Sequence, residues 1–309
     1  GGGQPDQLSQ ISYVGGTGNN DVVLRATALL VTTNVYLDGS GNLVVEDILG
    51  GNNTNDTLSI SRVGSDYVIE DTTGNVLGTL IVGATQTHVN RIVVPVSLVT
   101  GGLAVNTLGG NDTVTLGNLG TLGGNLTIDA GTGQDRIVHN GNVTLTGGFE
   151  ADYSAEVIEL NTNSSITTNS GNITLEGNLP GTGTGTFKGI TLNNADLAST
   201  TGNIMLTGQG GSTGVRNYGV NIYGGSTLVT GGGVSITGTG GGDGLSATQF
   251  GVLITTSSVV ATGTGSVTLN GQGGDATQTA DGLIIEKGAT IQTSGGNLTL
   301  TGTGGTAGN

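Results

Sequence analysis

The stretch Gly296-Asn297-Leu298-Thr299-Leu300-Thr301-Gly302 is the fifth copy of one pattern in the sequence. The pattern reads Gly, any residue, apolar, polar, apolar, any residue, Gly, and its other copies begin at residues 171, 202, 232 and 265. The first apolar positions of successive copies lie 31, 30, 33 and 31 residues apart. A repeat of this length, with one short strand per copy, is typical of a stacked β architecture.

Residues 157–309 carry two further columns of apolar residues at the same period. The first column comprises Leu160, Leu192, Ile222, Ile254 and Ile285. The second comprises Ile166, Leu197, Leu228, Val260 and Ile291. Successive columns lie five to seven residues apart within a turn, which leaves room for a short strand and a corner but not for a helix. The sequence therefore predicts an all-β fold, a parallel β-helix with three strands per turn of about 31 residues and five turns in this region.

Residues 101–156 show a shorter period of 23 residues. Leu103-Ala104-Val105 is matched by Leu126-Thr127-Ile128, and Asp112-Thr113-Val114 is matched by Asp135-Arg136-Ile137. We expect two stacked turns here, followed by an acidic break at 147–156, with residue n lying over residue n+23.

Residues 1–100 contain signals for antiparallel hairpins. A first strand is expected near 11–14, followed by a tight turn at 15–21. Asp38-Gly39-Ser40-Gly41-Asn42 and Gly64-Ser65-Asp66 each separate two apolar runs and are short enough for hairpin loops. Parallel strands need longer connections. We therefore expect a hairpin-rich β region outside the regular solenoid.

Composition and charge exclude several functions. Gly accounts for 63 of 309 residues without a Gly-X-Y period, which excludes collagen, and aromatics for only 3%, which suits a thin aliphatic core. The net charge of −15 makes nucleic acid and anionic membrane surfaces improbable partners and favours a cation such as Ca²⁺. No apolar run is long enough for membrane insertion, and the absence of Cys excludes disulfides.

The strands at 171–175, 201–206, 265–269 and 295–300 (GNITL, TGNIML, GSVTL, GGNLTL) resemble those of filamentous haemagglutinin-like and autotransporter adhesins of bacteria. Proteins of this kind are long right-handed β-helices on the cell surface. The resemblance covers residues of about 100–309. It implies exposure on a bacterial surface and adhesive or structural work.

A second, narrower resemblance concerns calcium. Gly131-Thr132-Gly133-Gln134-Asp135-Arg136-Ile137 is similar to the Gly-x-Gly-x-Asp-x-apolar calcium repeat of secreted RTX proteins, and 110–114 match its second half. Residues 18–21 and 55–58 are more degenerate copies. RTX repeats follow one another every nine residues, whereas the shift here is 23.

Stacking supplies an independent reason to consider a cation. A 23-residue register places Asp112 over Asp135 and Asn106 over Asp129. Like charges one step apart repel each other by roughly 1 kcal/mol in water, and a bound Ca²⁺ would remove that repulsion. The candidate calcium ligands are therefore Asp112, Asp135, Asp129 and Asn106. The alternative is that the Asp residues cap turns by accepting hydrogen bonds from nearby backbone N–H groups.

Catalysis finds little support, although β-helices that cleave carbohydrate exist. Such enzymes need acids gathered on one face of neighbouring turns. The outward positions of the first and third strands of the long turns contain a single acid, Glu159, and the cations Lys188, Arg216 and Lys287 are isolated in the sequence. His139 is interpreted as a strand-edge residue, and the Asn-x-Ser/Thr matches, such as Asn125, as part of the strand pattern. We expect no enzymatic activity.

The resulting hypothesis is an extracellular structural or adhesive β-solenoid on a bacterial surface: a fibre subunit, an adhesin stalk or a surface-layer component. The final strands present Leu298, Leu300, Ile291 and Ile285 without a partner above them in the sequence, so they are the candidate assembly face. The expected partner is a second copy or a flanking segment stacked end to end, and surface glycans are a further candidate partner. A carbohydrate-binding or carbohydrate-cleaving module is the alternative.

Overall fold

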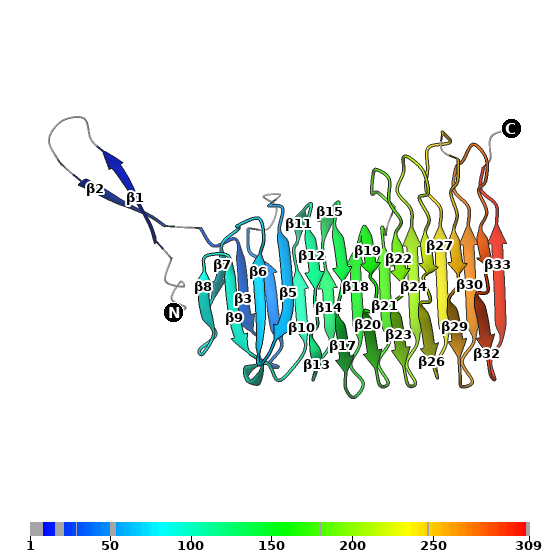
Figure 1. The fold of residues 1–309 in the computed structure, drawn as a ribbon, viewed down its shortest axis with the longest axis horizontal. Coiled ribbons are helices and arrows are strands. Elements are labelled where there is room, and N and C mark those ends of the chain that lie inside the picture. The colour runs from blue at the N-terminus through cyan, green and yellow to red at the C-terminus, as the bar shows by residue number, and fades with distance from the viewer. Residues whose placement is uncertain are drawn as a thin grey trace.

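The computed structural model describes residues 9–15, 22–28, 30–49, 54–179, 181–245 and 247–306. Three long sheets run side by side along a rod and enclose a narrow core (Figure 1). The predicted all-β fold, a parallel β-helix preceded by antiparallel hairpins, is confirmed. β1 (Ser9–Gly15) and β2 (Val22–Ala28) form a separate antiparallel pair, which confirms the first predicted strand. The turn expected at 15–21 lies almost wholly outside the described residues.

Sheet 1 has 11 strands and includes the strand quoted first, β33, at one edge. In order across the sheet they are β33 (Leu298–Thr303), β30 (Val267–Gln272), β27 (Val234–Thr239), β24 (Ile204–Gln209), β21 (Ile173–Gly177), β18 (Ala151–Ala155), β14 (Leu126–Asp129), β10 (Leu103–Asn106), β4 (Leu43–Asp47), β3 (Thr33–Leu37) and β7 (Leu77–Thr79). The strands from β33 to β4 are parallel. Their register aligns the predicted column from Ile173 to Leu298 without a slip.

Sheet 2 also has 11 strands. They are β31 (Leu283–Glu286), β28 (Val252–Thr255), β25 (Val220–Tyr223), β22 (Ile190–Asn193), β19 (Val157–Leu160), β16 (Arg136–His139), β12 (Thr113–Leu116), β5 (Thr57–Val63), β6 (Asp66–Asp71), β9 (Arg91–Pro95) and β8 (Thr85–His88). From β31 to β5 the strands are parallel. The predicted column from Leu160 to Ile285 is confirmed.

Sheet 3 has seven parallel strands. They are β13 (Gly120–Leu122), β17 (Asn142–Leu145), β20 (Ser165–Thr168), β23 (Asp196–Ser199), β26 (Thr227–Thr230), β29 (Ser258–Ala261) and β32 (Thr290–Thr293). The predicted column is wrong at one rung, because Leu228 pairs with Val259 and not with Val260. Two adjacent valines satisfy the apolar pattern equally well, and the preceding corner, where Thr256 has a φ of 52°, sets which of them points inward.

The described residues also include the two-stranded sheet of β11 (Gly109–Gly110) and β15 (Thr132–Gly133). The helical segment that they contain is the 3-10 turn η1 (Val96–Leu98). Within the same residues, no helix has the length and apolar character needed to cross a membrane.

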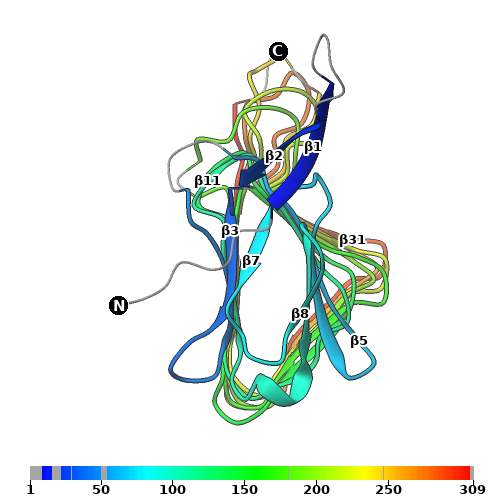
Figure 2. The same ribbon diagram turned by 90° about the vertical axis from the view of Figure 1, so that its left-hand side faces the viewer.

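Both predicted hairpins form, but each gives one arm to the solenoid. β3 pairs with β4 and β5 pairs with β6 in antiparallel fashion. β4 and β5 also pair in parallel with β10 and β12, so residues 43–60 supply a first rung of sheets 1 and 2. The remaining arms lie over that end of the rod (Figure 2). The sequence conceals this rung because the inserted hairpins lengthen the repeat from 23 residues to 60 in sheet 1 and 56 in sheet 2.

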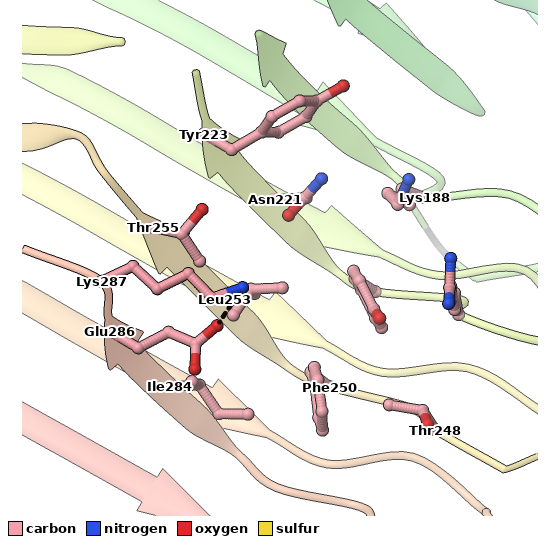
Figure 3. A pocket seen from close by; sticks show the side chains of 12 residues that line it. Lys188, Asn221, Tyr223, Thr248, Phe250, Leu253, Thr255, Ile284, Glu286 and Lys287 are labelled. Carbon is pink, nitrogen blue, oxygen red and sulfur yellow. Dashed lines mark ion pairs between the residues drawn. The ribbon is translucent and has the colours of Figure 1, made fainter. Parts of the chain in front are cut away.

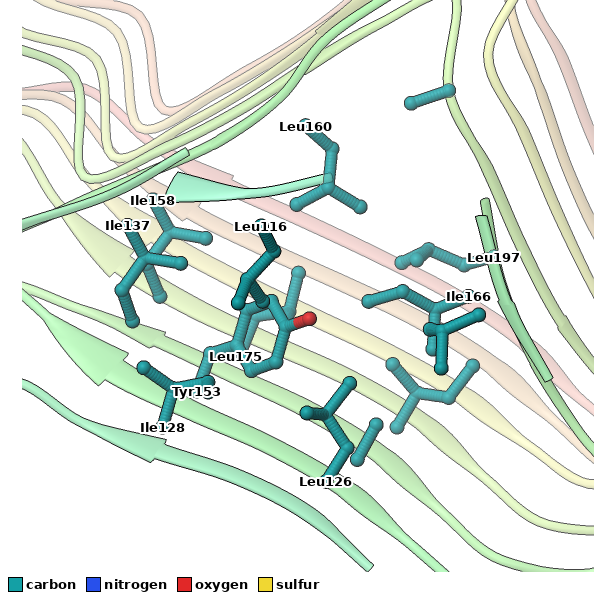
Figure 4. Packing of buried hydrophobic residues seen from close by; sticks show 14 of the residues in the cluster. Leu116, Leu126, Ile128, Ile137, Tyr153, Ile158, Leu160, Ile166, Leu175 and Leu197 are labelled. Carbon is teal, nitrogen blue, oxygen red and sulfur yellow. The ribbon is translucent and has the colours of Figure 1, made fainter. Parts of the chain in front are cut away.

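The acidic segment at 147–156 contains a strand of the solenoid, where a break was expected. β18 lies between β14 and β21 in sheet 1, and its Tyr153 is aligned with Ile128 and Leu175. Tyr153 is fully buried, and Figure 4 shows its ring among aliphatic side chains of the core. The charged residues Asp152 and Glu156 masked the strand, because only every second residue of it faces the core.

The Gly-Asn dipeptides of the repeat are explained by hydrogen bonds between rungs. The side-chain oxygen of Asn172 accepts the backbone N–H of Asn203 (2.8 Å), and that of Asn203 accepts the N–H of Gly233 (2.8 Å). Asn125 accepts the N–H of Glu150 in the same way (3.0 Å). A side chain at the corner therefore supplies a contact where the strand ladder is interrupted. These bonds support a structural role for the Asn-x-Ser/Thr sequences.

The last Gly of each copy closes the junction between sheets 1 and 2. Gly177, Gly208, Gly238 and Gly271 form one column, and each faces the backbone at the start of the next sheet 2 strand. A Cβ atom on Gly177 would lie 2.5 Å from the carbonyl oxygen of Gly189. A side chain at this position would therefore push the two sheets apart.

Candidate functional site

A row of buried carboxylates lies where the turns pass from sheet 1 to sheet 2. Asp112 stacks on Asp135, as predicted, and the row extends to Asp56 on one side and Glu156 on the other. The backbone N–H groups of Asp56, Asp112 and Asp135 donate to the carboxylates of Asp112, Asp135 and Glu156 at 2.8, 2.8 and 2.9 Å. We call these four residues the acid row.

The acid row is short of hydrogen-bond partners. Asp56, Asp112 and Asp135 are at most 1% exposed, and the Oδ2 atom of each is buried without a partner. Burial raises the pKa of Asp56 and of Asp135 to about 7 in each case, and it also raises the pKa of Asp112. Burial therefore shifts each of these carboxyls toward its neutral, protonated form, because the charged form is costly to bury.

The other two candidate calcium ligands lie apart from the acid row. Asn106 and Asp129 are aligned in sheet 1, as predicted, but Asp129 is exposed on its outer face. Their side-chain oxygens accept hydrogen bonds from the backbone N–H groups of Leu108 (3.1 Å) and Gly131 (3.0 Å). These two side chains therefore cap turns, as the alternative to calcium binding proposes. In the described part of the chain, no three His, Cys, Asp or Glu side chains converge on a point that could hold a metal ion. The carboxylates form a row and not a cage, and calcium binding remains a prediction.

A small acidic groove of about 260 Å³ crosses the outer face of sheet 1, and Asp129, Asp152 and Glu176 contribute to its lining. Burial raises the pKa of Asp152. The sequence argument against catalysis missed this gathering of acids, because it treated the segment that contains Asp152 as a break in the solenoid. The expectation that the chain is not an enzyme remains a prediction.

A groove with a volume of about 510 Å³ lies on the outer face of sheet 2, across β25, β28 and β31 (Figure 3). Its charged lining residues are Lys188, Arg216, Glu286 and Lys287. Its aromatic and other lining residues are Tyr218, Tyr223, Phe250, Asn221, Thr248, Leu253, Thr255 and Ile284. We call this feature the cationic groove.

The cationic groove contains an ordered aromatic stack. The rings of Tyr218 and Phe250 lie 5.0 Å apart at an angle of 19°, and the Lys188 ammonium lies 5.7 Å from the Tyr218 ring centroid. Burial lowers the pKa of Lys188, and Glu159 and Arg216 shift it in opposite directions. Lys287 pairs with Glu286 at 3.2 Å. The groove is therefore cationic with aromatic faces, in a chain whose net charge is −15.

The three cations that look isolated in the sequence thus converge in space. Lys188 and Tyr218 each precede a sheet 2 strand by two residues, so the register of Ile190 and Val220 stacks them. The same rule brings Phe250 beside Tyr218. This signal was present in the sequence, but it requires the alignment of the loops as well as the strands.

The predicted assembly face is the last described rung. Leu298 and Leu300 of β33 are 46% and 47% exposed, whereas Ile285 and Ile291 are half-buried. β31, β32 and β33 each pair on one side only within the described residues. This rung therefore presents apolar side chains beside free backbone donors and acceptors.

His139 is a core residue, and its interpretation as a strand-edge residue is wrong. It is fully buried in the column between Leu116 and Leu160, and its Nδ1 lies 2.8 Å from the Tyr153 hydroxyl. Burial lowers the pKa of His139 to about 4, so the imidazole is neutral at pH 7. Its Nε2 is buried without a partner. The pair joins sheet 2 to sheet 1 across the interior.

None of these features can be assigned by similarity to known proteins. No protein-family model, curated protein or solved structure matches the chain.

Proposed function

We propose that the chain is an extracellular structural and adhesive β-solenoid of a bacterial surface. The observation that carries this proposal is the continuous core, a single cluster of buried residues that runs from Val35 to Leu269, with Leu283, Ile285 and Ile291 of the last described turn packed against it. Successive rungs are joined by backbone hydrogen bonds in three sheets at once. A rod of this kind resists bending and carries loops at its surface, as a fibre subunit or an adhesin stalk requires.

End-to-end stacking is the second element of the proposal. Leu298 and Leu300, with Ile285 and Ile291, offer a second copy or a further segment the same contacts that each rung offers the next. Burying the two leucines would contribute roughly 25 cal/mol for each Å² of apolar surface removed from water.

Light scattering over a range of protein concentrations, with negative-stain imaging, tests this stacking. We expect a molar mass that rises with concentration and rods longer than one chain. The Leu300→Lys variant should remain monomeric, because a charge would be buried in the interface. The matched control is Val229→Lys, which adds the same charge at an apolar residue that is 36% exposed on the side of the rod. A parent that is monomeric at every concentration, or a control that dissociates equally, would contradict stacking.

Carbohydrate binding is the second candidate function, and the cationic groove is the observation that favours it. Sugar-binding sites combine aromatic faces with polar side chains that fix orientation, and the groove has both. The acidic groove on sheet 1 makes cleavage the test to perform alongside binding. A reducing-sugar assay is expected to show no product. If the parent protein releases reducing sugar and the Asp152→Asn variant does not, the function would be hydrolysis of carbohydrate and not binding alone.

A further inference from the structure

We infer that the cationic groove binds an anionic saccharide, a chain of sugars that carries carboxylate or sulfate groups. The inference rests on the carbohydrate-binding function proposed above and adds the class of sugar and the residues that recognise it. It starts from the placement of Lys188, Arg216 and Lys287, which share this groove out of the seven basic residues of the chain.

Two of the three cations of the groove, Lys188 and Arg216, are available to a ligand. Among the described residues, Lys188 and Arg216 form no ion pair, whereas Arg91, Arg136 and Lys287 each pair with a glutamate. Arg216 has a φ of 61°, and its backbone is fixed by a hydrogen bond from its N–H to the carbonyl of Thr248 (3.0 Å). The guanidinium at the end of this exposed side chain can bind a carboxylate or sulfate with two parallel hydrogen bonds.

The aromatic stack explains why the anion should belong to a sugar. Tyr218 and Phe250 occupy adjacent rungs and stack on each other, and Tyr218 is only 7% exposed. Phe250 is half-buried, so the pair forms a short aromatic strip whose accessible surface belongs mainly to Phe250, with Tyr218 holding that ring in place. The C–H faces of pyranose rings pack on such surfaces while their hydroxyl groups remain at the edges, where Asn221, Tyr223 and Thr255 lie (Figure 3). A small inorganic anion would use the cations but not this strip.

The direction of the groove suits a polymer. It crosses three strands of sheet 2, and each rung advances by about 4.8 Å, a step comparable with one sugar in an extended chain. A ligand with a repeating negative charge can therefore reach Lys188 at one end and Lys287 at the other while it covers the aromatic strip. The acidic remainder of the molecule disfavours the same ligand elsewhere, which confines it to the groove.

Titration calorimetry on the whole chain tests the inference with four probes: a uronic-acid hexasaccharide, its carboxyl-reduced neutral counterpart, a sulfated hexasaccharide of the same backbone, and sodium sulfate. We expect the charged hexasaccharides to bind about tenfold more tightly than the neutral one, which corresponds to about 1.4 kcal/mol. Their affinity should fall as salt is added. The carboxylate and sulfate arms identify which anion the groove prefers.

Variants locate the site. Lys188→Gln and Arg216→Asn should each weaken the charged probes about fivefold and leave the neutral probe unchanged; Asn is chosen because it tolerates the positive φ of Arg216. Tyr218→Ala should weaken charged and neutral probes alike. Arg62→Gln, which removes an equal charge outside the groove, is the matched control and should change nothing. Thermal melts of all variants show that the fold is retained.

The outcomes separate the inference from the function on which it rests. Equal binding of neutral and charged probes would overturn the anionic preference and leave carbohydrate binding standing. Failure of every saccharide to bind the parent, or tight binding of sodium sulfate alone, would overturn both. A loss of affinity in Arg62→Gln equal to that in Lys188→Gln would also overturn the inference, because the attraction would then be nonspecific.

Discussion

The short turns and the long turns of the rod use one register position in opposite ways. This position lies at the corner where the chain enters sheet 2. It is two residues before the first residue of each sheet 2 strand that faces the core. In the short turns it holds the acid row, Asp56, Asp112, Asp135 and Glu156, whereas the long turns place Lys188, Tyr218, Phe250 and Asp281 there. The first set is buried, and Lys188, Tyr218 and Phe250 of the second line the cationic groove.

The length of the preceding loop accompanies this difference, except at Asp56, whose connection is longer. Between β10 and β12, β14 and β16, and β18 and β19, sheet 1 passes to sheet 2 through at most six residues, and the side chain at the corner is enclosed between rungs. In the long turns, the glycine column and Gly189, Gly219, Gly251 and Gly282 bring the two backbones together, so the loop leaves the core and the corner residue faces the groove. In the long turns this position is therefore less enclosed while the strands keep their register: Lys188 and Phe250 are half-buried there, and Tyr218 is 7% exposed.

The largest expected effect is steric and belongs to the long turns. A Cβ atom on Gly238 would overlap the carbonyl oxygen of Gly251, so Gly238→Ala should separate sheets 1 and 2 and cost about 3 kcal/mol or more. Thermal or denaturant unfolding followed by circular dichroism measures the loss. The control is Gly39→Ala, where no atom lies within 4 Å of the added methyl group. Equal stability of the two variants would show that the sheets do not meet as closely as described.

The next effect concerns the acid row of the short turns. Because the pKa values of Asp56 and Asp135 are raised to about 7, their contribution to stability is complete below pH 3.8 and is lost as the pH rises through 7. Asp56→Asn and Asp135→Asn should therefore stabilise the protein by about 1–3 kcal/mol at pH 8 and by little at pH 4. Urea unfolding at both pH values measures this.

His139 has the opposite pH dependence, so the variants must be compared with the parent at each pH. Its pKa is lowered to about 4, and its contribution to stability is lost as the pH falls from 6.5 through 4. A stability difference between Asp135→Asn and the parent that does not change with pH would show that the acid row is not titrating.

A double-mutant cycle tests the polar pair inside the short turns. Tyr153→Phe and His139→Leu each leave the other group buried without its partner and should cost about 1–3 kcal/mol. The double variant should recover part of this loss, because no orphaned polar group remains. Chemical unfolding of the four proteins provides the coupling energy. Strictly additive losses would mean that the 2.8 Å contact contributes nothing.

The smallest expected effect is that of calcium. Ca²⁺ would compensate the charges of Asp56 and Asp135 mainly above pH 7, where these two carboxyls ionise. We expect a rise of a few degrees in the melting temperature with calcium relative to EGTA at pH 8, and none in Asp112→Asn/Asp135→Asn. Identical melts at pH 8 would contradict calcium stabilisation.

The sequence predicted the strands and their columns well, because alternation of apolar residues is local and the repeat is regular. The register of Asp112 over Asp135 followed from the same counting. The first rung escaped detection because hairpins interrupt its period. Val260 was predicted in place of Val259 because the apolar pattern does not determine which of two adjacent valines faces the core.

The sites were harder to predict, because they depend on where loops and corners lie. Lys188 and Arg216 are 28 residues apart, and only the closure of the long loops brings them to one groove. Asp152 was overlooked because its strand reads as an acidic linker, although its neighbours Ala151 and Tyr153 face the core. Burial of His139 depended on a partner in another sheet, Tyr153, which the spacing of its own strand does not reveal.

The acid row also has a consequence for a rod under tension. The hydrogen bonds between rungs point along the rod axis, so a pull on the two ends loads the rungs in series, and the weakest one opens first. Ionisation of Asp56, Asp112 and Asp135 weakens the rungs at 56–157 and leaves the aliphatic rungs beyond them unchanged. In alkaline surroundings these short turns would open at a lower force than the other rungs, and in acid this difference would disappear.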